Sequence, residues 1–210
     1  MTPRPDVSAE RKDQILNTAE DVFAQRGFDE ARMDDIAERS GLSKGAIYWY
    51  FKKKDDIIAA LLDRVFRRNI ESMRATASRP VGVVARLATM GEQISRDFES
   101  MSRLMPVVLE FYAVALRQRA VRKRLAAMYG EFLSILVPLI EEGVRNGELD
   151  VDVNPRQAAT LLLGIYEGLG LVWAISPKTV DWKTLGPEAA LTICSGLKKK
   201  EHGKQERRSK

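Results

Sequence analysis

A short run of residues, Lys44-Gly45-Ala46 followed by Tyr48-Trp49, carries the side chains best suited to specific chemistry in this sequence. On one helix these five residues cannot all be buried, and an exposed pair of large aromatic rings is unfavourable in water unless it meets a partner. Glycine and alanine let a helix backbone approach the wall of a groove. Tyr48 and Trp49 offer flat apolar contact to a thymine methyl or a sugar, and polar hydrogens for phosphate. The run therefore predicts contact with double-stranded nucleic acid.

Two short helices joined by a tight turn must position this run. Ile36 and Ala37 face inward on a helix predicted at 33–40, and Ser43 is suited to cap the helix that follows. Gly41 can adopt the positive φ that ends a helix abruptly. This arrangement is typical of a helix-turn-helix. The same pattern also fits two helices of a small bundle, so the outer face of the second helix is what favours a nucleic-acid function.

The net charge of +5 supports nucleic-acid binding only weakly, because of where the charge lies. Residues 197–210 carry seven basic and two acidic side chains, which accounts for the whole excess, whereas residues 1–54 carry ten of each kind. Between Arg39 and Lys54, however, five basic side chains occur without any acidic residue. We therefore expect a locally positive surface there, with specificity that comes from contacts and not from bulk charge.

Several classes of protein do not fit the sequence. A single cysteine, Cys194, cannot form an internal disulfide, and the single histidine, His202, lies in a lysine-rich terminal segment. We find no Gly-rich phosphate loop and no nucleophile–base pair, so we expect no catalytic residue, no metal site and no cofactor. We also expect no membrane partner, because no apolar run approaches the ~20 residues of a membrane span. These features predict a soluble cytoplasmic protein that is not an enzyme.

The chain as a whole reads as amphipathic helices, which predicts an all-α fold of about nine helices. We expect them at about 9–26, 33–40, 43–51, 54–77, 81–100, 104–117, 121–146, 155–175 and 187–197.

The eighth predicted helix includes AATLLLGIYEGLGLVWAI and is apolar almost all round, so it must be buried on more than one side. We expect it to pack on its own domain and on a partner subunit. Gly164 and Gly168 permit a close approach of helices, and the last helix offers a second apolar stripe. The predicted dimer interface comprises Leu161, Gly164, Gly168, Val172, Leu191 and Cys194.

Over residues 11–61 the sequence resembles the DNA-binding domain of the tetracycline-repressor (TetR) family of bacterial transcriptional regulators. The matching pieces are Ile15-Leu16, Ala19, Phe23, Gly27-Phe28, Asp35-Ile36-Ala37 and Gly41 through Phe51, ending at Lys54. The resemblance implies phosphate contacts from Ser43, Tyr48 and Lys54. It places Lys44, Gly45, Ala46 and Trp49 nearest the base edges, and Tyr50 as a brace for the helix that also approaches the DNA backbone.

The sequence departs from the family at Ala31 and Arg32, where threonine or serine usually caps the second helix and touches phosphate. Ala31 can do neither. Arg32 can replace the phosphate contact but not the cap, and an ordinary solvated arginine is an equal alternative. We expect the start of the second helix to rely on Asp29 or on water.

The resemblance also implies how the whole molecule works. In this family the last two helices of two subunits form a four-helix dimer interface, and the dimer reads a palindromic operator. A small effector bound in the helical body favours a spacing of the recognition helices that no longer fits DNA. The predicted organisation is a DNA-binding domain at 1–54, an effector-binding and dimerisation domain at 55–197, and a basic, disordered tail at 198–210.

Methionine and aromatic side chains suit an adaptable apolar cavity, which favours a hydrophobic or amphipathic effector. Arg86 and Glu110 are possible charged members of such a pocket, and plain core packing is the alternative for each apolar one. The predicted pocket residues are Met90, Phe98, Met101, Met105, Phe111, Tyr112, Met128, Tyr129, Phe132 and Tyr166.

The sequence thus predicts a sequence-specific DNA-binding regulator, a repressor, whose partners are a DNA operator, a second copy of the chain and a small effector. The alternative is a helical protein that associates with nucleic acid non-specifically through its basic tail.

Overall fold

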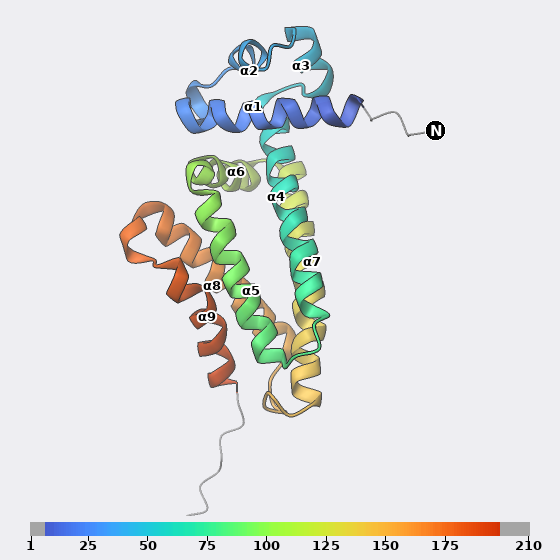
Figure 1. Ribbon diagram of the computed structural model, residues 1–210, viewed down its shortest axis with the longest axis vertical. Helices are drawn as coiled ribbons and strands as arrows, with labels where there is room; N and C mark the ends of the chain where they lie inside the picture. Colours follow the sequence, from blue (N-terminus) through green and yellow to red (C-terminus); the bar gives the residue numbers. More distant parts are fainter. Residues whose placement is uncertain (1–6, 198–210) are drawn as a thin grey trace, which may run out of the picture. The chain divides into compact units, whose positions relative to one another are not determined.

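A computed structural model describes residues 7–197, and the regular structure of that range is helical (Figure 1). The α-helices are α1 (Val7–Glu30), α2 (Met33–Ser40), α3 (Lys44–Tyr50), α4 (Lys54–Ala77), α5 (Val83–Ser100), α6 (Met105–Arg117), α7 (Arg119–Arg145), α8 (Pro155–Ile175) and α9 (Trp182–Gly196). Short 3-10 turns lie at Ser102–Leu104 and Pro177–Thr179. The predicted all-α class is confirmed. The tail predicted at 198–210 lies outside the described residues.

Helix α9 begins earlier than predicted. We expected Pro187 to open this helix, but Asp181 caps it by accepting the Lys183 N–H at 3.2 Å and the Thr184 hydroxyl at 2.8 Å. Trp182, in the first turn, is buried. The prediction was wrong because a proline tolerated near a helix start need not be its first residue, and here a carboxylate cap several residues earlier sets the start.

The chain folds into two compact units. Among the described residues, the first unit comprises those up to Ile70 together with Asp97–Tyr129, and the second comprises Glu71–Arg96 and those from Gly130 onward. The helices α4, α5 and α7 each contribute to both units. The domain boundary predicted after residue 54 stays a prediction, although the first unit includes residues well beyond that point.

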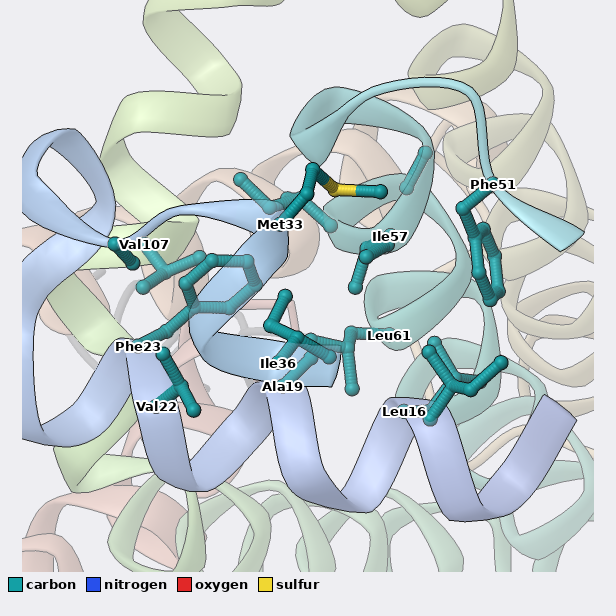
Figure 2. Close-up of a cluster of buried hydrophobic side chains, with 14 of the residues drawn as sticks. Leu16, Ala19, Val22, Phe23, Met33, Ile36, Phe51, Ile57, Leu61 and Val107 are labelled. Carbon is teal, nitrogen blue, oxygen red and sulfur yellow. The ribbon is translucent and has the colours of Figure 1, made fainter. Parts of the chain in front are cut away.

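The core of the first unit fixes the helix-turn-helix on a wider helical base. Figure 2 shows Phe23 of α1, Ile36 of α2 and Leu61 of α4 converging on one cluster, which also includes Val107 of α6. Each of these side chains is at most 3% exposed. Burying a side chain of this size contributes about 1.5–3 kcal/mol, so the three N-terminal helices are held mainly by this shared core.

Two glycines shape the connections around α2. Gly27 interrupts α1 with φ 74° and ψ 171°, a combination that is nearly restricted to glycine, and Phe28 then packs edge-on against Phe23 at 5.9 Å. Gly41 ends α2 with φ 68° and ψ 16°, and its N–H points to the carbonyls of Ala37 and Glu38. The sharp turn between α2 and α3 that the sequence predicts is therefore present.

Asp35 holds the start of α2. Its carboxylate accepts the Arg32 N–H at 2.8 Å and forms an ion pair with Arg26 at 2.7 Å. This contact comes from Asp35 and not from Asp29 as expected. A carboxylate three residues into a helix can reach back to the cap residue, which is half of a capping box, and Ala31 is free to be buried.

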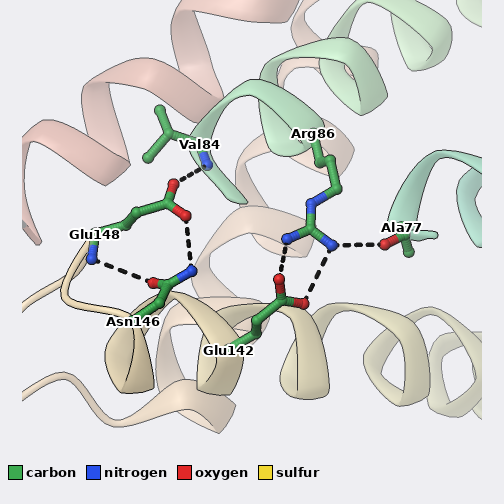
Figure 3. A network of polar contacts seen from close by, with 6 residues as sticks. All are labelled: Ala77, Val84, Arg86, Glu142, Asn146 and Glu148. Atoms are coloured by element: carbon green, nitrogen blue, oxygen red, sulfur yellow. Dashed lines mark hydrogen bonds and ion pairs between the residues drawn. The ribbon is translucent and has the colours of Figure 1, made fainter. Parts of the chain in front are cut away.

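In the second unit, a polar network ties the end of α4 to α5 and α7 (Figure 3). Arg86 is 5% exposed, donates to the Ala77 carbonyl at 2.7 Å and forks onto the carboxylate of Glu142. Nearby, Glu148 accepts the Val84 N–H at 3.2 Å and the side-chain amide of Asn146 at 2.8 Å. Arg86, considered above as a possible pocket charge, is thus engaged in packing these helices together.

The helices α5, α8 and α9 approach one another closely at a second point. A Cβ placed on Gly91 would lie 2.4 Å from the Tyr166 hydroxyl and 2.5 Å from the Gly186 carbonyl oxygen. The Tyr166 hydroxyl donates to that same carbonyl at 2.7 Å. Burial raises the pKa of Tyr166. This hydroxyl therefore remains protonated and committed to the backbone of α9.

Helix α8 corrects the expectation that no apolar run is long enough for a membrane span. It has 21 residues, and an 18-residue window within it has a mean hydropathy of 1.7. By length and composition alone, the helix is therefore long and apolar enough to cross a membrane. Only 28% of that window is buried. The sequence-based expectation was wrong because residues 158–175 contain only one charged residue, Glu167, which is too few to interrupt an apolar run of this length. The helix thus has a largely apolar face that its own chain leaves uncovered.

Candidate nucleic-acid interface

Helix α3 is rigidly mounted from one side. Ser43 caps it by accepting the Ala46 N–H at 3.2 Å, and Ile47 and Phe51 are buried in the core of the first unit. The opposite face is open: Lys44 and Gly45 are exposed. A short helix with one anchored face and one free face can enter a DNA groove without rearranging its own core.

The aromatic residues of α3 form the apolar part of this free face. Trp49 is 68% exposed and Tyr48 is 43% exposed. Tyr50 is half-buried, and its ring lies edge-on to Trp49 with 4.6 Å between centroids. Tyr50 thus packs against the Trp49 ring and helps to hold it in place. The exposed surfaces of Tyr48 and Trp49 are available for contact with a partner.

The positive charge of this region is partly offset by acids from elsewhere in the sequence. Lys44 pairs with Asp34 of α2 at 2.6 Å, Arg39 reaches Asp21 at 3.5 Å, and Lys53 pairs with Asp55 at 3.2 Å. The locally positive surface expected for residues 39–54 is therefore partly neutralised by acids that lie outside this range. The Lys44 and Arg39 pairs join different helices, so they depend on tertiary packing, which spacing along the chain does not reveal.

Lys54 and Arg32, two predicted phosphate contacts, have different surroundings. The Lys54 ammonium donates to the carbonyls of Phe28 at 2.6 Å and Asp29 at 3.1 Å, and lies 4.5 Å from the Phe28 ring centroid. It therefore joins the start of α4 to the end of α1. The exposed Arg32 side chain makes no cap bond to α2. A phosphate role for either residue stays a prediction.

Sequence reasoning missed the contribution of Asp34. The sequence does contain a sign of it: two adjacent acids, Asp34 and Asp35, lie in the first turn of α2, and one is enough to hold the helix start. Asp35 takes that role, so Asp34 is left to face Lys44. Asp56, also missed, accepts the N–H groups of Lys52 and Lys53 at 3.1 and 3.2 Å and so orders the basic segment after α3.

The predicted effector residues are mostly interior. Met90, Phe132 and Tyr166 belong to the second unit, and the other seven belong to the first. Six of the ten are buried and four are half-buried; the half-buried ones are Phe98, Met101, Tyr112 and Tyr129. Core packing explains the burial of each residue on its own, so their role in binding an effector stays a prediction.

The predicted dimer residues lie mostly on open faces of α8 and α9. Leu161 is 60% exposed, Val172 is 42% exposed and Leu191 is 37% exposed. Gly164 and Gly168 are exposed, and nothing lies within 4 Å of a Cβ placed on either. Cys194, by contrast, is buried within its own chain, so we exclude it from the proposed surface.

Comparison with known proteins gives matches over most of the chain. Residues 15–61 match the family model of bacterial regulatory proteins, tetR family, and residues 83–196 match that of the BetI-type transcriptional repressor, C-terminal. The chain is similar to the fatty acid metabolism regulator protein of Bacillus subtilis (strain 168), with 25% identity over 191 residues that cover 89% of this chain and 95% of the relative.

Two further similarities extend over comparable lengths. The HTH-type transcriptional regulator TtgR of Pseudomonas putida is 29% identical over 182 residues, which cover 82% of this chain and 84% of that protein. Among solved structures, the transcriptional regulator FadR from Bacillus subtilis in complex with stearoyl-CoA superposes with a TM-score of 0.72 and 26% identity, covering 88% of this chain and 98% of the other.

Proposed function

Because this chain belongs to the tetR family of bacterial transcriptional regulators and is therefore a DNA-binding regulator, we propose that it is a cytoplasmic, dimeric repressor released by a small effector. The single observation that carries the proposed DNA contact is the free face of α3, where Tyr48 and Trp49 are exposed beside Lys44. In this proposal Lys44, Gly45, Ala46 and Trp49 approach base edges. Ser43, Tyr48, Tyr50, Lys54 and Arg32 contact the DNA backbone.

The dimer is proposed from the uncovered apolar surface of α8 and α9. Besides Leu161, Val172 and Leu191, this surface includes Leu171 at 47% exposed and Ile175 at 74% exposed. A contiguous apolar surface of this kind is unfavourable in water, and a twofold interface covers the same patch on both copies. Two subunits also supply two recognition helices for the half-sites of a palindromic operator.

For the effector, we propose a molecule with a long apolar part. A relative has been solved with stearoyl-CoA, and the predicted pocket residues are methionines and aromatic side chains that adapt to such a ligand. To shift the protein from mostly bound to mostly free, the effector must favour the unfit state by roughly 5 kcal/mol. Adding stearoyl-CoA, with coenzyme A alone as the control, to the protein–DNA complex tests this chemistry directly.

Fluorescence anisotropy with the full-length protein tests the DNA-binding proposal. The probe is a duplex that the wild-type protein selects from a randomised pool. Tyr48→Ala should weaken binding to this duplex by roughly two- to tenfold, as expected for the loss of one hydrogen bond. Leu116→Ala is the matched control, because Leu116 is a large side chain that is 77% exposed on α6. Equal affinity of both variants and the wild type would argue against α3 as the DNA-reading element.

A further inference from the structure

The Lys44–Asp34 pair occupies the part of the helix-turn-helix that is proposed to meet DNA. Lys44 Nζ lies 2.6 Å from Asp34 Oδ2, and the two side chains are 67% and 53% exposed. Lys44 is the first residue of α3, and Asp34 is the second residue of α2. The hydrogen bond to Asp34 raises the pKa of Lys44, so the Lys44 amine remains protonated at neutral pH. An acidic group is thus fixed beside a predicted base-contacting amine.

Asp34 is not the residue that holds the start of its own helix, because Asp35 does so. The start of α2 is held by Asp35, which accepts the Arg32 N–H and pairs with Arg26. An acid near a helix start adds only a small stabilisation through the helix dipole. An exposed ion pair contributes similarly little to folding. The position of Asp34 is therefore better explained by what it does to Lys44 than by stability.

The pair changes how Lys44 responds to different DNA surfaces. Contact with a phosphate would remove Lys44 from Asp34 and leave a carboxylate beside a polyanion, which disfavours non-specific binding. At a matching site, guanine O6 and N7 can replace the carboxylate as acceptors, and Asp34 can in turn accept a cytosine N4–H donor. A repulsive element of this kind raises selectivity by weakening the wrong complexes more than the right one.

We propose that Asp34 is a specificity-determining residue, which holds Lys44 away from phosphates and releases it where base-edge groups can satisfy both side chains. This inference rests on the proposed use of α3 in reading DNA. It concerns selectivity, whereas the proposed function concerns binding itself.

The test measures full-length protein against two duplexes: the one selected by the wild type from a randomised pool, and a scrambled duplex of the same composition. Asp34→Asn should raise affinity for the scrambled duplex roughly two- to fivefold, the range of an exposed charge pair. For the scrambled duplex, the slope of log affinity against log salt concentration should become more negative by about 0.9. The ratio of selected to scrambled affinity should fall. Asp13→Asn, an equal charge change at an exposed residue of α1, should leave the ratio unchanged.

A double-mutant cycle shows whether Asp34 acts through Lys44. Adding Asp34→Asn to Lys44→Ala should change the affinity ratio much less than Asp34→Asn does in the wild type, because only the direct effect of the carboxylate on DNA then remains. If Asp34→Asn leaves the ratio unchanged in the wild-type background, or lowers it equally in both backgrounds, the inference is wrong. Thermal unfolding of each variant checks that the fold is intact.

The same data separate the two proposals. If Lys44→Ala weakens binding to the selected duplex while Asp34→Asn leaves selectivity unchanged, only the role of Asp34 fails. If neither Lys44→Ala nor Tyr48→Ala changes binding to the selected duplex, the proposed use of α3 fails as well.

Discussion

At the residue scale, the free face of α3 depends on a few small and polar residues that the sequence places correctly. Ser43, Gly41 and Ile47 have the cap, turn and core positions expected of them. Local chemistry decides these positions, so the sequence predicts them. The Lys44–Asp34 and Lys54–Phe28 contacts were not predictable, because they join residues 10 and 26 positions apart through the tertiary fold.

Gly45 provides the sharpest residue-scale prediction, because stability and DNA binding should change in opposite directions. A Cβ at Gly45 meets only the Ser43 hydroxyl oxygen, at 3.9 Å, so Gly45→Ala fits and should stabilise the protein by up to about 1 kcal/mol. If the α3 backbone lies against a groove, the added methyl should weaken binding to the selected duplex by at least about fivefold.

Thermal unfolding and anisotropy on the same samples measure both effects of Gly45→Ala. Gly130→Ala is the control: it lies within α7, a Cβ there meets nothing within 4 Å, and it should stabilise without changing affinity. Tight binding by Gly45→Ala, equal to that of the wild type, would place Gly45 away from the DNA.

At the element scale, helix boundaries followed the sequence where a glycine or a cap marks them, as at the end of α2, with Gly41, and at the start of α8, with the Asn154 cap. The predicted start of α9 was wrong, because the Asp181 cap begins the helix at Trp182 and not at Pro187. Arg86 and Tyr166 also have partners that their residue types do not indicate. Their side chains fit a pocket by type, but their hydrogen bonds to Glu142 and to the Gly186 carbonyl join helices, and only the packed structure reveals those partners.

Glu142 should make the stability of the second unit dependent on pH. The hydrogen bond from Arg86 lowers the pKa of Glu142 in the folded protein. A lowered folded pKa means that the stabilisation is fully present above the ordinary carboxyl pKa of about 4.3 and is lost as pH falls through the folded value. Glu142→Gln should therefore lower the free energy of unfolding at pH 7, and the difference from the wild type should shrink below about pH 4.

Urea unfolding at neutral pH and at a pH below the ordinary carboxyl pKa checks this prediction. Glu141→Gln is the matched control, since Glu141 is an exposed neighbour on the same helix and should have little effect under either condition. A stability difference between the wild type and Glu142→Gln that stays constant with pH would show that the Arg86–Glu142 pair is not the cause.

At the scale of the whole molecule, the uncovered face of α8 and α9 predicts a dimer. Leu161→Glu places a charge in this apolar surface and should convert the dimer into a monomer, which size-exclusion chromatography with light scattering measures. Leu116→Glu, an equal change at a residue 77% exposed on α6, should leave the dimer intact. A wild-type protein that is monomeric at micromolar concentration would refute the proposed interface.

The sequence could predict this surface in kind but not in detail. The nearly uniform apolar character of residues 158–175 indicates burial on more than one side, yet it does not distinguish residues buried by the chain itself from those left exposed. Cys194 shows the difference, because it shares a helix with Leu191 but is 1% exposed.

Helix α3 is proposed to read specific bases, and selection of DNA from a randomised duplex pool is the most direct test of that role. The wild-type protein should recover an inverted repeat whose half-site centres lie about one helical turn, roughly 34 Å, or a multiple of it apart. Lys44→Ala should recover the same repeat with altered or relaxed preference at a few positions in each half-site. Recovery of no common sequence by the wild type, or of an identical one by Lys44→Ala, would show that α3 does not read the bases in this way.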